Sequence, residues 1–489
     1  MTLRRALIED ILTVSVLIVS PMLFGSVYIW AFSLVFFVTA ILFFSSSVFN
    51  VDDFKKVIKE PVTLLFLAFL AVNILYVIPF PSDVIRAVSP ETVLLRERYA
   101  IDQEARQCLS VYPHATALFL LKVTGCLLFY LYASGKLIAP EADPGRKKDH
   151  PDKRLISLAA LAGVLSLSVH AFADFSLRVP SNGLYFAALV SVILALGMPG
   201  DKAKVNVRFL MTLVNGVILA GFFTALFGMV QALSWNGKIY WLLEKQGGVF
   251  GPFINNNNYA GFIEMCIPFP LVLFVDAVVR SSLQYKHRAW DKFLWFFSDE
   301  ASGVYLYLTA AVVMIVSLFM TPSSGGMISF TVSFFMIFIT LTAFLTSGRK
   351  RNIFLSALVI SALFWAMLAW VGPDVFKGEV DKMRGLLNGD ARTQERIVIW
   401  KDSIGIMKDY PILGTGLGTF PYIYSKYRTL TDTLGARVEY AENEYVQLAV
   451  ETGAAGTAFA LFFLVFYFKR FGTCVMSLKK WRTQRHGDE

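Results

Sequence analysis

The sequence predicts an all-α polytopic membrane protein with about 12 transmembrane helices and a large polar loop before the last of them. Hydrophobic residues make up 56% of the 489 residues and charged residues only 17%, against about a quarter in soluble domains. Apolar runs of roughly 17–25 residues, each long enough to cross the hydrocarbon core as a helix, recur along the chain. Basic residues fall mostly in short loops between these runs. The net charge of +9 therefore indicates membrane orientation and not nucleic-acid binding.

The predicted spans share an apolar composition and a length close to the thickness of the hydrocarbon core. They lie near residues 11–29, 30–48, 62–80, 115–135, 155–173, 182–198, 208–232, 258–279, 302–320, 327–346, 353–372 and 453–469. Little separates the first two runs, so the division between them is open. We expect four parts: N-terminal membrane helices (1–207), membrane helices with an asparagine motif (208–372), a loop domain (373–452), and the last helix with a basic tail (453–489).

Loop charges predict the orientation of the chain. Lys and Arg gather on one side, at residues 4–5, 55–59, 146–154, 202–208, 286–288, 349–351 and 469–485. By the positive-inside rule this side is the cytoplasm, and both termini lie in it. The loop 373–452 then lies in the periplasm, since long loops are translocated largely regardless of charge. A structureless loop of this length is uncommon unless it is functional.

The long loop contains a predicted amphipathic helix at residues 391–410, where apolar residues recur at helical spacing. Arg392 and Arg396 are four residues apart and share one side of its first turn. Two guanidinium groups there can hold a phosphate or diphosphate through bidentate hydrogen bonds. A surface helix that lies on the membrane with solvated arginines is the alternative.

A glycine-rich segment follows Pro411, which ends this helix. Gly414, Gly416 and Gly418 alternate along it. Alternate glycines permit positive φ and can present backbone N–H groups to an anion. The segment has no Gly-Lys-Ser/Thr sequence, so it is not a nucleotide-binding loop. A plain turn is the alternative.

A polar stripe leads into the last span. Asn443, Gln447 and Glu451 recur every four residues and so share one face of a helix. Polar residues at the entrance of a span usually face a cavity or the helix bundle. Glu442, at the start of the stripe, could act as a general base. Helix capping by solvated acids is the alternative.

Ionisable and polar residues also occur within or beside other spans. Four consecutive asparagines, Asn255–Asn258, offer the paired donors and acceptors that suit sugar hydroxyls, and Glu264 follows inside the span. The alternative is an asparagine-rich cap with one satisfied buried acid. Lys122 lies inside another span, where it is a functional candidate or a snorkelling residue. His170 and Asp174, four apart, pair with each other or line the same cavity.

Three stretches together resemble the O-antigen ligase and O-antigen polymerase superfamily, in the order typical of it. These are residues 251–265, 396–420 and 442–456, and the resemblance covers roughly residues 210–470. It implies a glycosyltransferase C-like membrane protein of the bacterial inner membrane that needs no metal ion and no cofactor. The implied donor is an undecaprenyl-diphosphate-linked glycan. The implied acceptor is a glycan or the lipid A core, and the membrane lipids surround the site.

The residues and the resemblance together predict a site at the periplasmic face. Glu442 is the predicted base and Asn443 the residue that orients the acceptor. The remaining site residues are those predicted to hold the diphosphate (Arg396, Arg392, Lys122 and Arg437), to bind glycan (Asn255, Asn257, Asn258, Glu264, Gln447 and Glu451) and to form the loop (Gly414, Gly416 and Gly418). The resemblance itself supports only Arg396 among the four cations.

The sequence departs from the superfamily pattern at three places. Members often have His at the position of Glu442, Arg or His at the positions of Asn256 and Asn258, and Ser-Arg-Gly where this chain has Ser-Ser-Gly at 323–325. Either Glu442 replaces the base, or the chemistry differs, or the protein is not catalytic. The rival class is a non-catalytic or transport component that works with other parts of polysaccharide export. For an enzyme, the acceptor stays open, and we favour a polymerase or another exopolysaccharide role.

Overall fold

The structure is a computed structural model in which helices dominate, and it confirms the predicted all-α class. It describes residues 2–49, 51–99, 106–139, 151–172, 174–197, 205–244, 248–284, 302–344, 391–429 and 437–486. The helices are α1 (Thr2–Met22), α2 (Ile29–Phe49), α3 (Val51–Ile58), α4 (Pro61–Ile74), α5 (Ser82–Val88), α6 (Pro90–Tyr99), α7 (Pro113–Ile138), α8 (Lys153–His170), α9 (Pro180–Leu196), α10 (Val207–Leu233), α11 (Asn256–Cys266), α12 (Pro268–Gln284), α14 (Ser302–Met320), α15 (Ser324–Phe344), α18 (Ala391–Asp409), α19 (Phe420–Tyr427) and α20 (Glu444–His486). The short 3-10 helices are η1 (Phe24–Ser26), η2 (Leu75–Val77) and η3 (Ser176–Arg178), and the strands are β1 (Pro79–Pro81), β2 (Arg106–Cys108), β3 (Lys238–Ile239) and β4 (Leu243–Glu244).

Seven helical segments of the described chain are long and apolar enough to cross a membrane, and three shorter apolar helices accompany them. The seven are Ile29–Ser46, Pro113–Ile138, Lys153–His170, Val207–Leu233, Asn256–Val278, Gly303–Met320 and Glu444–Ser477, and the shorter three are Pro61–Val77, Pro180–Leu196 and Ser324–Thr340. They coincide with ten of the predicted apolar runs, which confirms a polytopic membrane protein. The predicted run 353–372 lies outside the described residues, and the run near 11–29 corresponds to α1, which carries charges in its first half.

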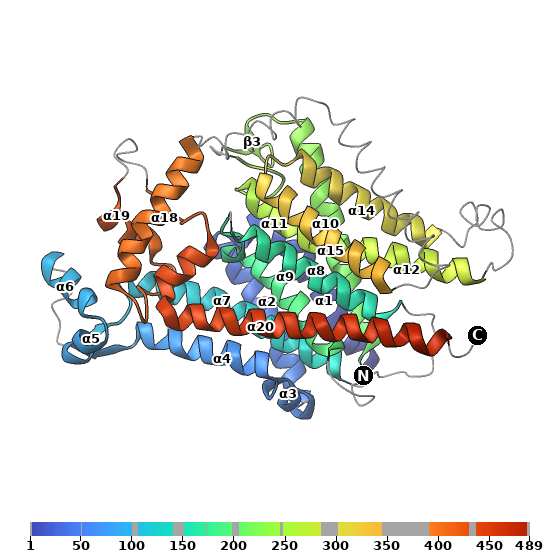
Figure 1. The fold of residues 1–489 in the computed structure, drawn as a ribbon, viewed down its shortest axis with the longest axis horizontal. Helices are drawn as coiled ribbons and strands as arrows, with labels where there is room; N and C mark the ends of the chain where they lie inside the picture. The colour runs from blue at the N-terminus through green and yellow to red at the C-terminus, as the bar shows by residue number, and fades with distance from the viewer. Residues whose placement is uncertain are drawn as a thin grey trace.

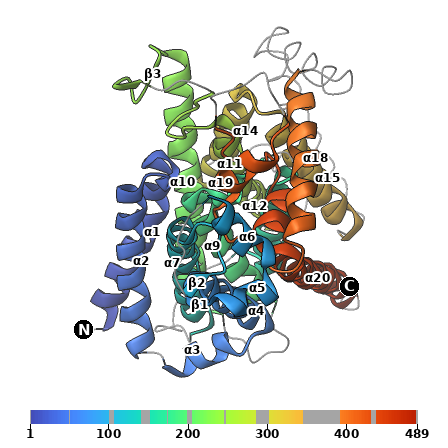
Figure 2. The same cartoon turned by 90° about the vertical axis from the view of Figure 1, so that its left-hand side faces the viewer.

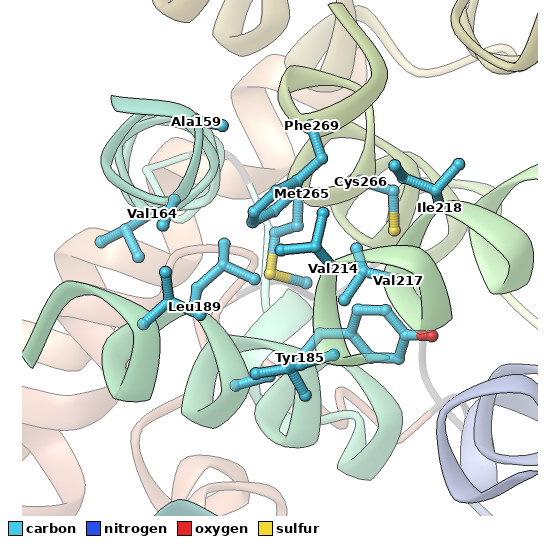
Figure 3. Close-up of a cluster of buried hydrophobic side chains, with 14 of the residues drawn as sticks. Ala159, Val164, Tyr185, Leu189, Val214, Val217, Ile218, Met265, Cys266 and Phe269 are labelled. Atoms are coloured by element: carbon cyan, nitrogen blue, oxygen red, sulfur yellow. The ribbon is translucent and has the colours of Figure 1, made fainter. Parts of the chain in front are cut away.

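The core of the bundle lies where α8, α9, α10 and α11 meet (Figures 1 and 3). Figure 3 shows Val164 of α8, Leu189 of α9 and Met265 of α11 packed together with side chains from α10. Tyr185 of α9 donates from its hydroxyl to the carbonyl of Leu17 at 2.8 Å, which ties α9 to α1. Each helix satisfies its own backbone groups, so side-chain packing between helices decides how the bundle assembles.

One end of the bundle is fastened by ion pairs between helices. They are Arg208–Asp10 at 2.9 Å, Arg470–Glu60 at 3.7 Å and Lys136–Glu9. The start of α1 and the end of α20 lie at this end (Figure 1). Both ends of the described chain therefore lie on the same side of the bundle, as an even number of spans requires. The cytoplasmic identity of this side remains a prediction.

The opposite end carries the short elements α5, α6, β1 and β2 together with α18 and α19 (Figures 1 and 2). Here the described part of the long loop has its own hydrophobic core, formed by Ile399, Ile406, Tyr410, Phe420, Ile423, Tyr424, Ala441 and Val450. This part of the loop is therefore a folded unit. The helix α20 is divided at Gly453, whose φ of 60° and ψ of −157° are not helical, so a helical stretch from Glu444 precedes the predicted span start at 453.

We expect reporter fusions at residues 150, 205 and 350 to read cytoplasmic and a fusion near residue 430 to read periplasmic. The expectation follows from the basic loops of the sequence and from the position of α18 and α19 opposite the termini. Fusions to alkaline phosphatase and to a cytoplasmic fluorescent reporter, made at the same residues, check each other. A cytoplasmic reading at 430 would contradict the orientation.

Candidate active site

The structure brings the helix of the long loop to the segment before the last helix. Arg396 of α18 donates from Nη2 to Oε2 of Glu442 at 3.1 Å. One turn later, Trp400 donates from Nε1 to the carbonyl of Ala441 at 2.8 Å and fixes the segment against α18. The side chains of Arg396 and Glu442 stay 30% and 29% exposed. The ion pair is therefore held in place by its surroundings and is still open to a ligand.

The surroundings of Glu442 favour its protonated form. Burial raises the pKa of Glu442 to about 7, the charge of Asp174 adds to the rise, and the Arg396 guanidinium opposes it. The like charge that adds to this rise in pKa, Asp174, is distant from Glu442 in the sequence. Glu442 also has a φ of +53°, which is uncommon for a residue other than glycine and recurs at functional sites. A carboxyl with a pKa near neutrality can exchange protons at physiological pH.

The other predicted diphosphate ligands are less closely grouped. Arg392 lies in the first turn of α18, and its side chain is outside the described part of the structure. The guanidinium of Arg437 lies 4.2 Å from the centre of the Tyr422 ring. Lys122 lies in α7 with its side chain partly exposed. Among the described residues, no contact joins Lys122 or Arg437 to Arg396, so a shared site remains a prediction.

A fully buried carboxylate, that of Glu451, joins three segments of the site. It accepts from Arg178 Nη1 at 2.9 Å, from the Gly418 N–H at 2.9 Å, from the Phe420 N–H at 3.3 Å and from Gln447 Nε2 at 3.1 Å. The amides of the glycine-rich segment thus do face an anion, as the pattern suggested. That anion is a side chain of the protein itself. The glycan-binding roles of Gln447 and Glu451 remain predictions.

The glycine-rich segment packs directly on the backbone of α20. The Gly416 N–H donates to the carbonyl of Glu451 at 2.8 Å. A Cβ on Gly414 would lie 2.5 Å from the Glu451 backbone, and a Cβ on Gly453 would lie 2.4 Å from the carbonyl oxygen of Ile412. Both glycines also have positive φ. The two backbones can approach this closely only because neither glycine has a side chain.

Arg178 belongs to the site although the sequence analysis did not single it out. It is almost fully buried in η3 and donates from Nε to Glu444 at 3.2 Å and from Nη1 to Glu451 at 2.9 Å. Its guanidinium also lies 5.2 Å from the centre of the Phe119 ring. One feature of the sequence could have identified Arg178. It is a basic residue in a short turn on the predicted periplasmic side, where short loops usually carry few basic residues.

Asn443 caps the last helix. Its Oδ1 accepts from the N–H groups of Tyr445 at 2.9 Å and Val446 at 3.1 Å, and its Nδ2 donates to the carbonyl of Phe172 at 2.9 Å. The side-chain amide therefore satisfies two of the N–H groups that an α-helix leaves free at its start. A contact between Asn443 and an acceptor sugar remains a prediction.

The asparagine motif is engaged in contacts within the protein. Asn255 accepts from the Asn257 N–H at 2.8 Å as the N-cap of α11, and Asn257 Nδ2 lies 3.5 Å from Asp174 Oδ1. Asn258 is buried, and its carbonyl accepts from Asn182 at 3.0 Å. These contacts are those of the capping alternative, and a role in glycan binding remains a prediction.

Glu264 forms a buried pair with His170. The Oε1 atom of Glu264 lies 2.9 Å from His170 Nδ1, and its Oε2 atom accepts from the hydroxyl of Ser329. His170 Nε2 lies 4.0 Å from Asp174. The main partner of His170 is therefore Glu264 of α11, which the i, i+4 spacing of His170 and Asp174 could not reveal.

An apolar helix bundle with a folded polar unit over one end defines a multi-pass membrane protein with a polar candidate site at one end of the bundle. Residues 309–475 match the model of the family described as O-antigen ligase, so the resemblance to the O-antigen ligase-related superfamily is confirmed over this part of the chain. The match includes Arg396, Glu442 and Glu451 and leaves the asparagine motif outside. No match was found among curated proteins or among solved structures. The family implies a glycosyltransferase-like enzyme of the O-antigen ligase or polymerase type.

We expect Arg178→Met to destabilise the protein by about 3–5 kcal/mol, because it leaves two buried glutamates without their cation. Arg86→Met is the matched control, since the Arg86–Glu97 pair is exposed and is expected to contribute at most about 1 kcal/mol. The measurement is the Tm of both purified variants in the same detergent. Equal melting temperatures would show that the buried ion pairs do not stabilise the fold.

Proposed function

We propose that this protein transfers or polymerises an undecaprenyl-diphosphate-linked glycan at the periplasmic face of the bacterial inner membrane. The observation that carries the proposal is the Arg396–Glu442 pair, which puts a cation and a near-neutral carboxyl 3.1 Å apart within the O-antigen ligase match. Transfer of a glycan from a lipid diphosphate needs both groups: a cation for the leaving diphosphate and a base for the acceptor hydroxyl.

In the proposed reaction, the hydroxyl oxygen of the acceptor sugar attacks the anomeric carbon of the donor. The new glycosidic bond forms as the bond between that carbon and the diphosphate oxygen breaks, and undecaprenyl diphosphate leaves with the bonding electrons. Glu442 takes the hydroxyl proton, and Arg396 stabilises the growing negative charge on the diphosphate through two N–H groups. No metal ion takes part in this scheme.

The replacement of the superfamily's histidine by Glu442 is compatible with base catalysis. An exposed glutamate has a pKa of about 4.3 and is a weak base, whereas histidine has a pKa of about 6.5. Burial and Asp174 raise the pKa of Glu442 to about 7, close to that of the residue it replaces. A base works best when its pKa is near the working pH. The local environment thus supplies the basicity that the side chain alone lacks.

The acceptor divides the proposal into a polymerase, which uses another lipid-linked glycan, and a ligase, which uses the lipid A core. The rival function is a non-catalytic or transport component of polysaccharide export. A deletion strain separates these cases through its glycans. Loss of a polymerase shortens the glycan chains, whereas loss of a ligase leaves full-length chains unattached to the lipid A core. Purified protein with a verified donor and acceptor tests catalysis itself, because an inactive component gives no product.

We expect Arg396→Ala to abolish glycan transfer at a normal level of expression. Arg396→Lys should rescue activity poorly, because an ammonium group lacks the planar pair of donors that a guanidinium offers a diphosphate. Lys401→Ala, an exposed residue of the same helix, is the control and should keep wild-type turnover. Transfer is measured in vitro with lipid-linked donor. Full activity of Arg396→Ala would remove this residue from the site.

We expect Glu442→Gln to keep the fold and lose roughly 10²–10⁴ in turnover rate, the usual range for loss of a general base. Wild-type turnover should rise with pH through about 7, because the base acts only after it has lost its proton. This rise of turnover with pH should be absent from the residual activity of Glu442→Gln. Glu442→His should retain activity, since it restores the residue type of the superfamily. Wild-type turnover by Glu442→Gln, at an unchanged Tm, would contradict the role of base.

A further inference from the structure

Four side chains from three distant segments meet on the surface of the protein, at the end of the bundle that carries α19 and β2 (Figure 2). The ring centres of Tyr112 and Tyr422 are 4.2 Å apart, and the ring planes are inclined by 40°. The guanidinium of Arg437 lies 4.2 Å from the centre of the Tyr422 ring. The ring of His114 lies edge-on to that of Tyr112, with the two centres 6.2 Å apart. We call these four residues the aromatic platform.

The platform is exposed, and its polar groups have no partner among the described residues. The two tyrosine side chains are 38% and 45% exposed, and His114 and Arg437 are exposed as well. Within the described part of the chain, neither tyrosine hydroxyl forms a hydrogen bond, and the imidazole and the guanidinium form neither a hydrogen bond nor an ion pair. By contrast, the hydroxyl of Tyr424, two residues further along α19, donates to Asp402 at 2.9 Å.

The backbone beneath the platform is fixed on both sides. The Val111 N–H donates to the carbonyl of Thr415 in the glycine-rich segment at 3.0 Å, and the Tyr112 N–H donates to the hydroxyl of Ser110 at 3.1 Å. On the other side, α19 is anchored by its opposite face, which lies in the hydrophobic core of the polar unit. A surface that is already ordered loses little conformational entropy when a ligand binds to it.

Ordered, exposed rings with unpaired polar groups fit the surface of a sugar. One face of a pyranose ring presents C–H groups, which pack against the electron-rich surface of an aromatic ring. The hydroxyls around the sugar need donors and acceptors, and two phenol groups, an imidazole and a guanidinium supply both. Tyrosine and arginine are also the residue types that contribute most to many binding surfaces.

The neighbours of the platform favour a glycan over a lipid surface. The exposed residues beside it on α19 and before α20 include Ser425 and Glu439, and both are polar. The outward surface of the apolar span α10 is different, since it exposes residues such as Leu219 and Phe223. The platform therefore belongs to the polar unit and not to the apolar surface of the bundle.

The platform is also continuous with the segment that carries the candidate base. Arg437 precedes Glu442 by five residues, so the two positions are at most about 18 Å apart. A glycan that places one hydroxyl at Glu442 can therefore reach the platform with sugars a few units further along its chain.

We propose that the aromatic platform binds the acceptor glycan through sugars that do not react. The rings of Tyr112 and Tyr422 pack against the C–H face of these sugars, and Arg437 and His114 form hydrogen bonds with their hydroxyls. In this role Arg437 binds sugar and not the donor diphosphate. The inference rests on the proposed function where it places the reacting hydroxyl at Glu442, whereas binding of a glycan to the platform stands apart from turnover.

The first experiment measures binding without reaction. The probe is the water-soluble oligosaccharide that mild acid releases from the surface polysaccharide of the host strain, and it carries neither lipid nor diphosphate. Equilibrium dialysis of the radiolabelled probe against the purified full-length protein gives the Kd. Tyr112→Leu and Tyr422→Leu should each raise this Kd about tenfold, because each removes a ring that packs against the sugar. Tyr99→Leu, which changes an exposed tyrosine of α6, is the control and should leave the Kd unchanged.

A double variant with Tyr112→Phe and Tyr422→Phe separates the hydroxyls from the rings. It keeps both rings and should raise the Kd about threefold to tenfold through the lost hydrogen bonds. The Tm of every variant is measured in the same detergent. Where a leucine variant does not fold, the phenylalanine variant takes its place in the comparison.

The second experiment measures transfer to acceptors of increasing length. With an acceptor long enough to reach the platform, Tyr422→Leu should raise the KM for the acceptor about tenfold at an unchanged kcat, because contacts with sugars that do not react are equal in the ground state and the transition state. With an acceptor of a single sugar, the variant and the wild type should have the same KM. A general defect of the site would affect both acceptors alike.

The outcomes separate the platform from the proposed function. An unchanged Kd in the leucine variants overturns the inference, and so does a wild-type protein that does not bind the probe. A lower Tm in lipid nanodiscs at an unchanged Kd makes the rings a membrane anchor and also overturns it. A raised Kd with an unchanged KM for the long acceptor overturns the assignment to the acceptor. A raised Kd in a protein without turnover upholds the platform as a glycan-binding site and rejects the proposed function.

Discussion

The buried carboxylate of Glu451 is the interaction on which the arrangement of the site depends. It joins the turn that carries Arg178, the glycine-rich segment through two backbone N–H groups, and the first turns of α20. An unpaired carboxylate at this depth would be strongly destabilising, so its four donors have to be in place together. The fold of the polar unit and the position of the last helix are thereby coupled in one set of contacts.

This coupling positions the Arg396–Glu442 pair. The glycine-rich segment cannot leave α20 without breaking the bonds to Glu451, and the segment before α20 is fixed on one side by Trp400 and on the other by the end of α8. Glu442 is therefore held between a helix of the polar unit and a helix of the membrane bundle. A carboxyl and a guanidinium that are held in this way are pre-organised, as the proposed reaction requires.

The two ends of the bundle use charge differently. At the end that holds the termini, ion pairs such as Arg208–Asp10 connect neighbouring helices and lie close to the water interface. At the other end, burial of Glu442 and, to a smaller extent, the charge of Asp174 raise the pKa of Glu442 against the opposing Arg396 guanidinium. The first arrangement fastens helices to one another. The second creates a carboxyl with a pKa near neutrality, which suits a reaction that moves a proton.

Much of the fold could be read from the sequence, because a membrane span depends on the length and composition of one continuous stretch. Ten of the predicted runs have matching apolar helices, and the helix at residues 391–410 was predicted closely. The predicted start of the last span at 453 coincides with Gly453, where the helical geometry of α20 breaks, and the residues from Glu444 onward form a helical stretch ahead of it.

The sequence by itself determined the spans, the polar unit before the last helix and the residue types that meet there. Only the tertiary structure decided their partners: Glu451 with Arg178 rather than with a ligand, His170 with Glu264 rather than with Asp174, and Asn443 as a cap. Spacing along one helix shows which side chains share a face. It does not show which distant segment covers that face, and the strength of a buried charge depends on that neighbour through distance and desolvation.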